Sequence, residues 1–430
     1  MRRTCPSSAS ATMPGAPGLD FETWESTTLN PPLLNQTKIS GAPSYPRFFE
    51  EKARIGWETI ALRSTWVNLV SFGMLLVATL SLVPSAIAAP KGHGVEVIAN
   101  ESARRVDITI DGKPFTAYMW PTTLKKPVLY PLIDSDGVTV TRGYPLAPLP
   151  GERVDHPHHA GMWFNYGNAN GFDFWNNSDA IKPEQQPKMG TVVHTRVVST
   201  RSGTDRGELV VDSEWITGAG NKILEQQTKY VFSKHDGQRL IDQIVTLKAV
   251  DKVVFNDDKE GVMGIRMARW LESPEEKGGI FTDANGNPTK VDAPAGPPAG
   301  PNPAPNPATG VYLTSEGVKG PAVWSTRGRW CSLTGHTTVA GQSGDHVDTI
   351  AIIDHPGNPG YPTYWHARGY GLFAANPLGR SIFDPKQPPF NYTLDKGQQT
   401  TFRYRVVIAD RAESADELNK EADAFAAEYK

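Results

Sequence analysis

Three histidines and an aspartate stand almost side by side in the sequence, as Asp155, His156, His158 and His159. Side chains of an extended segment alternate between two faces, so His156 and His158 would point to one face about 7 Å apart. Two imidazoles on one face can share a divalent ion with a third ligand, or one can transfer a proton while the other binds substrate. The surrounding segment 142–175 is poor in aliphatic residues. We therefore expect it to be the functional centre rather than core.

A structural role is the alternative for these histidines, as hydrogen-bonding groups at a sheet edge, where Pro157 would be tolerated. That interpretation suits a lone histidine better than three beside Asp155. We therefore expect one of two kinds of site. The first is a metal centre with His156 and His158 as ligands, and the second is a metal-free centre for acid–base catalysis or sugar binding.

A second candidate is the segment 353–379, where polar residues alternate with Trp365, Tyr370 and Phe373. Such a mixture suits sugars, because an aromatic face stacks on the C–H face of the ring while polar groups bind its hydroxyls. An aromatic core with polar residues in its loops is an equally good interpretation. The polar residues concerned are His355, His366, Arg368 and Asn376.

A third candidate is the acidic run 257–260, which is followed by Arg266 and Arg269. Glu260 could act as a base opposite a histidine acid, and either arginine could hold a carboxylate or phosphate by a bidentate contact. The alternative is a solvated turn, the more common role of a mixed charge run.

The elements that would position these residues are strands. Val106, Ile108 and Ile110 alternate with polar residues before the pair Asp111-Gly112, which predicts an opening hairpin. Successive strand patterns with no helical pattern between them predict an all-β fold, an antiparallel β-sandwich of supersandwich or jelly-roll type. The further predicted strands are 191–199, 208–216, 224–232, 240–247, 347–353 and 401–408.

One helix is expected at the C-terminus. Ser414 and Glu417 have the spacing of a capping box, and apolar residues then recur on one face, at Leu418, Ala422 and Phe425. The Pro/Gly-rich tract 285–310 is expected to be a flexible surface insertion within the sandwich domain, residues 90–430.

The first ninety residues predict export. The uncharged apolar run 66–83 is followed by small residues that suit cleavage near Ala88 or Ala89, so 62–89 is expected to be a signal peptide, or a membrane anchor if it is not cleaved. Residues 1–61 are expected to be a disordered extension or to precede the true translation start. The expected location is periplasmic or extracellular, with membrane contact only through an uncleaved N-terminal segment.

Composition excludes several classes of protein. The net charge is −3 and the basic residues are spread along the chain, so no nucleic-acid partner is expected. The two cysteines, Cys5 and Cys331, predict neither a disulfide nor a thiolate zinc site. No phosphate loop, dinucleotide fingerprint or nucleophile elbow is present.

Three motifs in the same order resemble those of a family of exported bacterial proteins labelled PmoA-like, or methane oxygenase. The motifs are VTRGYPL through PGERVDHPHHAGMWFNYGNANGFDFW, then KEGVMGIRMA, then WHARGYGLFAANPLG, and the resemblance covers about 95–410. It implies fold and location rather than a mechanism. Methane oxidation is not expected, because residues 90–430 contain no further apolar run that could cross a bilayer.

The closing segment 394–410 is similar to the last strand of the galactose mutarotase-like superfamily of β-sandwiches. In that superfamily a histidine acid and a carboxylate base act across a sugar ring. The resemblance implies His156 or His158 as the acid and Glu260 as the base.

The leading hypothesis is an exported carbohydrate-active protein that binds a sugar or glycoside and acts by histidine–carboxylate or metal-assisted chemistry, as an epimerase, lyase or hydrolase. The alternatives are a non-catalytic glycan-binding module and a metal-dependent oxygenase in which two histidines and a carboxylate hold iron. No cofactor is required, although a divalent metal ion is compatible with the histidines. The expected catalytic residues are His156, His158 and Glu260, and the expected substrate-binding residues are Arg142, Asp155, His159, Trp163, Arg266, His355, His366, Arg368 and Asn376.

Overall fold

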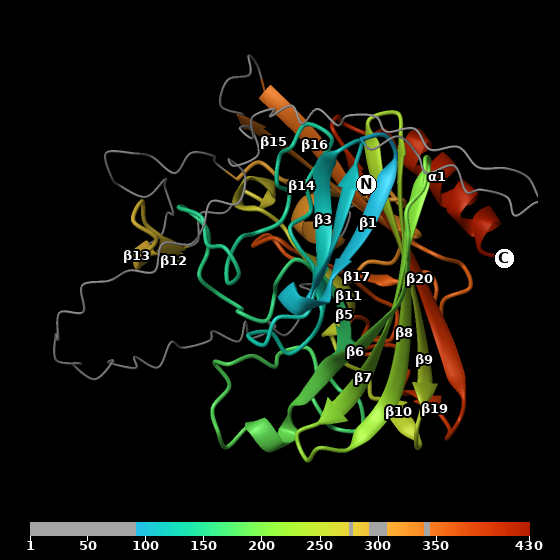
Figure 1. Ribbon diagram of the computed structural model, residues 1–430. Coiled ribbons are helices and arrows are strands. Elements are labelled where there is room, and N and C mark those ends of the chain that lie inside the picture. Colours follow the sequence, from blue (N-terminus) through green and yellow to red (C-terminus); the bar gives the residue numbers. More distant parts are fainter. Residues whose placement is uncertain (1–91, 275–277, 292–307, 339–344) are drawn as a thin grey trace, which may run out of the picture. The chain divides into compact units, whose positions relative to one another are not determined.

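The computed structural model describes residues 92–274, 278–291, 308–338 and 345–430. These residues form two eight-stranded sheets, and every strand pair within them is antiparallel (Figure 1). The predicted β-sandwich is therefore confirmed. No helix in the described part of the chain is long and apolar enough to cross a membrane. The expectations for residues 1–89 lie outside the described residues.

The first sheet carries four of the candidate site residues on its strands, Trp163, Arg266, His366 and Asn376. It opens with the predicted hairpin, in which Asp111 and Gly112 both have positive φ, the geometry that a tight two-residue hairpin turn needs. In spatial order its strands are β1 (Val95–Asn100), β2 (Arg105–Ile110), β3 (Lys113–Met119), β4 (Val128–Leu129), β5 (Met162–Tyr166), β11 (Gly261–Arg266), β18 (Leu372–Asn376) and β17 (Tyr364–Ala367).

The second sheet contains all six of the further predicted strands. In spatial order it consists of β14 (Val311–Thr314), β15 (Trp330–Thr338), β16 (Asp345–Asp354), β20 (Gln399–Ala409), β9 (Gln238–Ala249), β8 (Lys222–His235), β7 (Arg206–Thr217) and β6 (Gly190–Arg201).

Smaller elements complete the fold. Part of the Pro/Gly-rich tract is extended as β13, while residues 292–307 lie outside the described residues. The small sheets are β10 (Val253–Phe255) with β19 (Tyr392–Leu394), and β12 (Gly279–Thr282) with β13 (Pro288–Val291). The short 3-10 helices are η1 (Glu101–Ala103), η2 (Gln186–Lys188), η3 (Arg269–Leu271) and η4 (Gly320–Val323).

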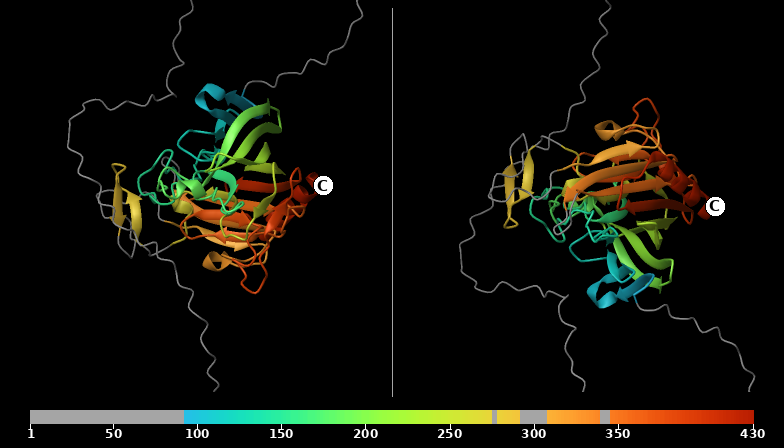
Figure 2. Two further views of the ribbon diagram at one scale, coloured as in Figure 1. Left: turned by 90° about the horizontal axis from the view of Figure 1, so that it is seen from below. Right: turned by 90° about the horizontal axis from the view of Figure 1, so that it is seen from above.

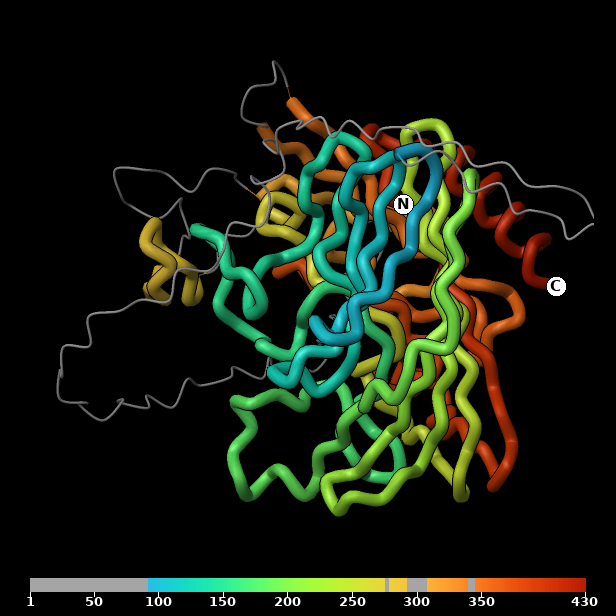
Figure 3. The backbone as a smooth tube through the Cα atoms, in the orientation of Figure 1, coloured from blue at the N-terminus to red at the C-terminus, as the bar shows by residue number. Residues whose placement is uncertain are grey.

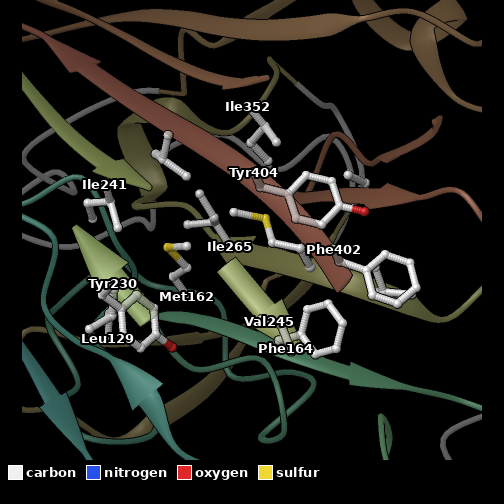
Figure 4. Packing of buried hydrophobic residues seen from close by; sticks show 14 of the residues in the cluster. Leu129, Met162, Phe164, Tyr230, Ile241, Val245, Ile265, Ile352, Phe402 and Tyr404 are labelled. Carbon is white, nitrogen blue, oxygen red and sulfur yellow. The ribbon is translucent and has the colours of Figure 1, made fainter. Parts of the chain in front are cut away.

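The main core lies between the two sheets (Figure 4). Met162, Phe164 and Ile265 of the first sheet and Val245 and Phe402 of the second belong to one buried cluster. Burial of these apolar faces supplies the main driving force for folding.

The outer face of the second sheet is covered by α1 (Ala415–Glu428), as Figure 2 shows with the red helix beside the orange and red strands. Leu418, Ala422 and Phe425 pack on residues of β9, β16 and β20. The capping box between Ser414 and Glu417 is formed, so the predicted helix is confirmed.

The outer face of the first sheet is covered by connections rather than by a helix. The chain between β4 and β5 leaves the strands as a long loop, teal in Figure 3. Trp163, Trp175, Leu372 and Ala374 form a separate buried cluster on this face, and Tyr370 packs against it. The candidate site is built on this face.

Candidate functional site

One row of paired residues crosses four strands of the first sheet. Trp163 of β5 pairs with Gly264 of β11, Gly264 pairs with Ala374 of β18, and Ala374 pairs with His366 of β17. Paired residues in a sheet point to the same face. Their neighbours in sequence belong to the core between the sheets, so Trp163 and His366 point to the opposite, outer face.

Position 264 requires a glycine because the ring of Trp163 lies directly over it. A Cβ atom at this position would lie 2.7 Å from Cζ2 of Trp163 and 2.9 Å from Cη2 of Trp175. The strand therefore accepts no side chain here unless the indoles move.

The histidine segment is a turn rather than an extended strand. The backbone N–H of His159 donates to the carbonyl of His156 at 2.9 Å, and His156 has a φ of +42°. The ring of His156 consequently stacks on His159, with centroids 4.9 Å apart and planes 6° apart, while His158 meets it edge-on at 5.6 Å. The expectation that His156 and His158 share a face of an extended segment is thus wrong, because the turn rotates the chain between them.

A buried ion-pair network supports this turn. Oδ1 of Asp155 accepts from Nη1 of Arg142 at 2.5 Å and from Nη2 of Arg266 at 2.7 Å. Burial alone would raise the pKa of the Asp155 carboxyl. The two guanidiniums, that of Arg266 first, outweigh burial and hold this pKa well below its usual range. Asp155 is therefore a fixed anion and not a proton donor.

Arg142 is a clamp for the turn. Its side chain is fully buried and donates to four backbone carbonyls, those of Arg153 at 3.2 Å, Asp155 at 3.0 Å, His156 at 3.1 Å and His159 at 2.9 Å. Because these acceptors lie in or directly before the histidine turn, Arg142 positions the histidines rather than reaching outward.

His159 is buried and held between two donors. Its Nε2 accepts from Nε1 of Trp175 at 3.2 Å, and its Nδ1 lies 3.4 Å from Nη1 of Arg266. Burial, followed by the neighbouring imidazoles and guanidiniums, lowers the pKa of His159 well below its usual value. A ring that faces N–H donors at both nitrogens cannot readily accept a proton.

His156 is the accessible histidine of the group, with a side chain that is 38% exposed. Its Nδ1 lies 3.2 Å from Oδ2 of Asp155, and its ring stacks on that of Tyr370 at 5.1 Å. A carboxylate at one ring nitrogen fixes the orientation of the other nitrogen for proton transfer or hydrogen bonding.

Lys126 joins the site although its sequence pattern did not single it out. Its Nζ donates to the carbonyl of Trp175 at 3.3 Å and lies 5.0 Å from the ring centre of Trp163. Burial lowers the pKa of Lys126 to about 7. Burial, followed by the charge of Lys126, also lowers the pKa of His158 well below its usual value. Nothing in the local sequence distinguishes this buried lysine from Lys125 beside it.

Glu260 and His366 form a second polar pair on this face. Nδ1 of His366 lies 3.7 Å from Oε2 of Glu260, and Nε of Arg368 lies 3.4 Å from Nε2 of His366. Burial raises the pKa of Glu260 to about 7 and lowers that of His366 to about 3. Both groups are thus driven toward their neutral forms. The charge of Glu260 also contributes to the raised pKa of Tyr370, which stacks on His156.

Two of the expected substrate-binding residues have structural partners. His355 packs edge-on against Phe425 of α1 at 5.2 Å, on the outer face of the second sheet and apart from the other candidates. Asn376 accepts from the N–H groups of Leu378 and Gly379 and donates to the carbonyl of Asp258 at 2.8 Å. Asn376 therefore fixes the loop that leads to Glu260.

Both signs of charge surround the histidine cluster. Arg142, Arg266 and Lys126 lie around it, Asp155 contacts both arginines, and Asp173 and Glu272 act on the same cations. The cations next to the imidazoles oppose a metal cation there and favour a developing negative charge. Within the described residues, the group of three side chains spaced to hold a metal ion lies elsewhere, at Asp134, His346 and Asp348. That group of side chains could hold a metal ion.

The chain belongs to a family of unknown function, DUF6807, whose model matches residues 105–423. The match does not carry the methane oxygenase label of the PmoA-like resemblance. Among curated proteins, none matches this chain.

Solved structures show only a distant likeness. A putative aldose 1-epimerase from Escherichia coli K12 has 12% identity and a TM-score of 0.28, with 74% of this chain and 99% of that chain covered. A galactose mutarotase-like protein from Clostridium acetobutylicum has 11% identity and a TM-score of 0.33, with 75% of this chain and 100% of that chain covered. A GH36 α-galactosidase from Geobacillus stearothermophilus has 9% identity and a TM-score of 0.31, with 74% of this chain and 41% of that chain covered. The chain thus spans less than half of that galactosidase, and a likeness at this level carries no argument about function.

Proposed function

We propose that this protein binds a carbohydrate on the outer face of its first sheet and transfers protons to or from it without a metal ion. The observation that carries the proposal is the Glu260–His366 pair. A carboxyl group with a pKa of about 7 is present as both acid and base near neutral pH, which is the condition for efficient general acid–base catalysis.

The surroundings of this pair support a sugar as the ligand. The half-buried rings of His156 and Tyr370 present aromatic surface, and Arg368 adds a polar group beside His366. Aromatic faces flanked by hydrogen-bonding groups match the apolar faces and the hydroxyls of a sugar ring.

The charge of the histidine cluster supports a reaction with a negatively charged transition state. Lys126 and Arg266 are buried beneath this face, so they would favour an enolate or alkoxide on a bound sugar through their electrostatic field rather than by direct contact. Glu260 would take or return the proton, while His156, oriented by Asp155, would serve the opposite side. Epimerisation and β-elimination both proceed through such steps. The same charges oppose iron at His156 and His158, so we rank the oxygenase alternative below proton transfer.

Export is also part of the proposal. It is supported by the apolar run 66–83 and the small residues that follow it. An exported protein of this kind would meet its sugar in the periplasm or outside the cell.

The test is an NMR screen of glycosides and keto-sugars in D₂O with the full-length protein. We expect at least one sugar to exchange a carbon-bound proton for deuterium or to lose a leaving group. Glu260→Gln should reduce that rate at least 100-fold, since general acid–base groups contribute about 10²–10⁴-fold. Glu184→Gln, at an exposed position, should leave it unchanged. Binding that persists without any turnover would indicate a glycan-binding module instead.

A further inference from the structure

A second group of buried ionisable residues lies at β16 of the second sheet, whereas the histidine cluster lies on the outer face of the first sheet. His346 and Asp348 are two positions apart on β16, so they share the face of that strand that also presents Ile350 and Ile352 to the core. Asp134 reaches them from the loop between β4 and β5, which is closed by a bridge between Ile133 and Thr139.

We propose that Asp134, His346 and Asp348 bind one divalent transition-metal ion. Nε2 of His346 lies 2.7 Å from Oδ2 of Asp134 and 3.2 Å from Oδ1 of Asp348, and all three ligand atoms lie within 4.8 Å of one another. Ligands about 2.1 Å from a metal at right angles to each other are about 3 Å apart. The distances from Nε2 of His346 to the two carboxylate oxygens therefore match neighbouring positions of one coordination shell.

The carboxyl group of Asp348 supplies the second, independent observation. Its side chain is fully buried. Nε2 of His346 lies 3.2 Å from its Oδ1 without forming a hydrogen bond, and neither oxygen has a hydrogen-bond partner among the described residues. A buried carboxylate without donors is strongly unfavourable. A cation would remove this penalty for both aspartates.

The neighbouring charged groups do not supply a cationic partner that contacts the two buried aspartates. Asp136 lies 3.8 Å from Nδ1 of His346, and Asp410 lies near enough for its charge to act on Asp348. Arg239 donates to the carbonyls of Pro114 and Ile133, and Arg411 pairs with Glu413 at 2.8 Å. Both arginines thus direct their hydrogen bonds elsewhere, although the charge of Arg239 also acts on Asp134. Asp136 and Asp410 add negative charge around the three ligands.

One nitrogen and two oxygen ligands suit manganese, iron or zinc better than calcium, which prefers an all-oxygen shell. The position indicates a structural role. The metal would tie β16 of the second sheet to the loop 133–139, and Arg142, which clamps the histidine turn, follows that loop directly. The ion would therefore position the proposed sugar site without touching it.

The test uses full-length protein without a histidine tag, stripped with EDTA and titrated calorimetrically with Mn²⁺ and with Zn²⁺. We expect one ion per chain at micromolar or lower Kd, and at least a 100-fold weaker Kd in Asp348→Asn and in His346→Gln. The double variant His156→Ala/His158→Ala should bind as the wild type does. An absence of binding, or a loss of binding only in the double variant, would overturn the proposal.

Thermal unfolding of the same samples separates loss of a ligand from loss of the fold. In EDTA, Asp348→Asn should have a higher Tm than the wild type, because it removes a buried carboxyl without a partner. On addition of Mn²⁺ or Zn²⁺, the Tm should rise in the wild type and stay constant in the variant. If the metal raises the Tm of both proteins equally, it binds elsewhere and the assignment is wrong.

Discussion

At the scale of single residues, burial rather than residue type decides which groups of this protein can exchange protons. The charges of Arg266 and Arg142 hold Asp155 as an anion, and burial together with the neighbouring imidazoles and guanidiniums lowers the pKa of His159. Glu260 and His366, by contrast, lack strong partners and are shifted by desolvation. Of the three histidines, His159 is buried while His156 and His158 are half-buried. The groups of this face whose pKa is shifted to about 7 are Glu260 and Lys126, outside the histidine segment.

The raised pKa of Glu260 predicts how stability depends on pH. Below its ordinary value of 4.5 the carboxyl is protonated in both the folded and the unfolded chain. As the pH rises toward about 7, the unfolded chain ionises while the folded one retains the proton, so stability is lost across this window. Urea unfolding of the wild type and of Glu260→Gln should show the variant gaining about 3 kcal/mol relative to the wild type between pH 4.5 and 8. For Glu184→Gln the difference from the wild type should be constant with pH.

Asp155 is expected to stabilise the fold through the two arginines. Asp155→Asn leaves the buried guanidiniums of Arg142 and Arg266 without their anion, which should lower the free energy of unfolding by about 3 kcal/mol. Asp179→Asn is the matched control, because Asp179 pairs with Lys125 at the surface and exposed pairs contribute little. Equal effects of the two substitutions would show that the buried network is not needed.

At the scale of elements, strand pairing assembles what the sequence keeps apart. The predicted strands are correct because their alternation extends over many residues, as in β7 with its strictly alternating burial. The turn at His156 was not predicted, since it depends on clamping by Arg142 from another segment. Nor could the sequence pair Glu260 with His366, because the pairing of β11 with β18 and of β18 with β17 brings them together. The contact between Asp134 and His346 could not be predicted from the sequence either, because the two residues are 212 positions apart.

Gly264 tests the packing of this row of strands. Gly264→Ala should lower the free energy of unfolding by about 1–3 kcal/mol, because the new methyl group meets the rings of Trp163 and Trp175. Trp163→Phe removes the ring atom closest to that methyl group, so the double variant should be less destabilised than the sum of the two single changes. Additive losses in chemical denaturation would contradict this packing.

At the scale of the whole molecule, the two faces of the sandwich have different roles. The outer face of the second sheet is closed by α1, whereas the outer face of the first is covered by loops that carry polar side chains. Loops on a rigid sheet are a common place for binding and catalysis. The family match over 105–423 includes all of the second sheet, every strand of the first sheet except β1, and the proposed metal ligands.

Export predicts a shortened chain. If the protein is expressed in a bacterium with a periplasm, mass spectrometry of the mature form should find an N-terminus near residue 89 or 90, because the small residues there suit cleavage. Replacing Ala88 by a bulky residue such as Phe should retain the uncleaved form at the membrane. A full-length cytoplasmic product would contradict export.

The dependence of kcat/KM on pH, measured for a sugar that the NMR screen identifies, tests the central claim most directly. With Glu260 as the base, kcat/KM should rise tenfold per pH unit below about pH 7 and level off above it. Glu260→Gln should abolish that inflection together with most of the rate. A profile without an inflection near pH 7, or one that Glu260→Gln leaves intact, would contradict the role assigned to this glutamate and its histidine partner.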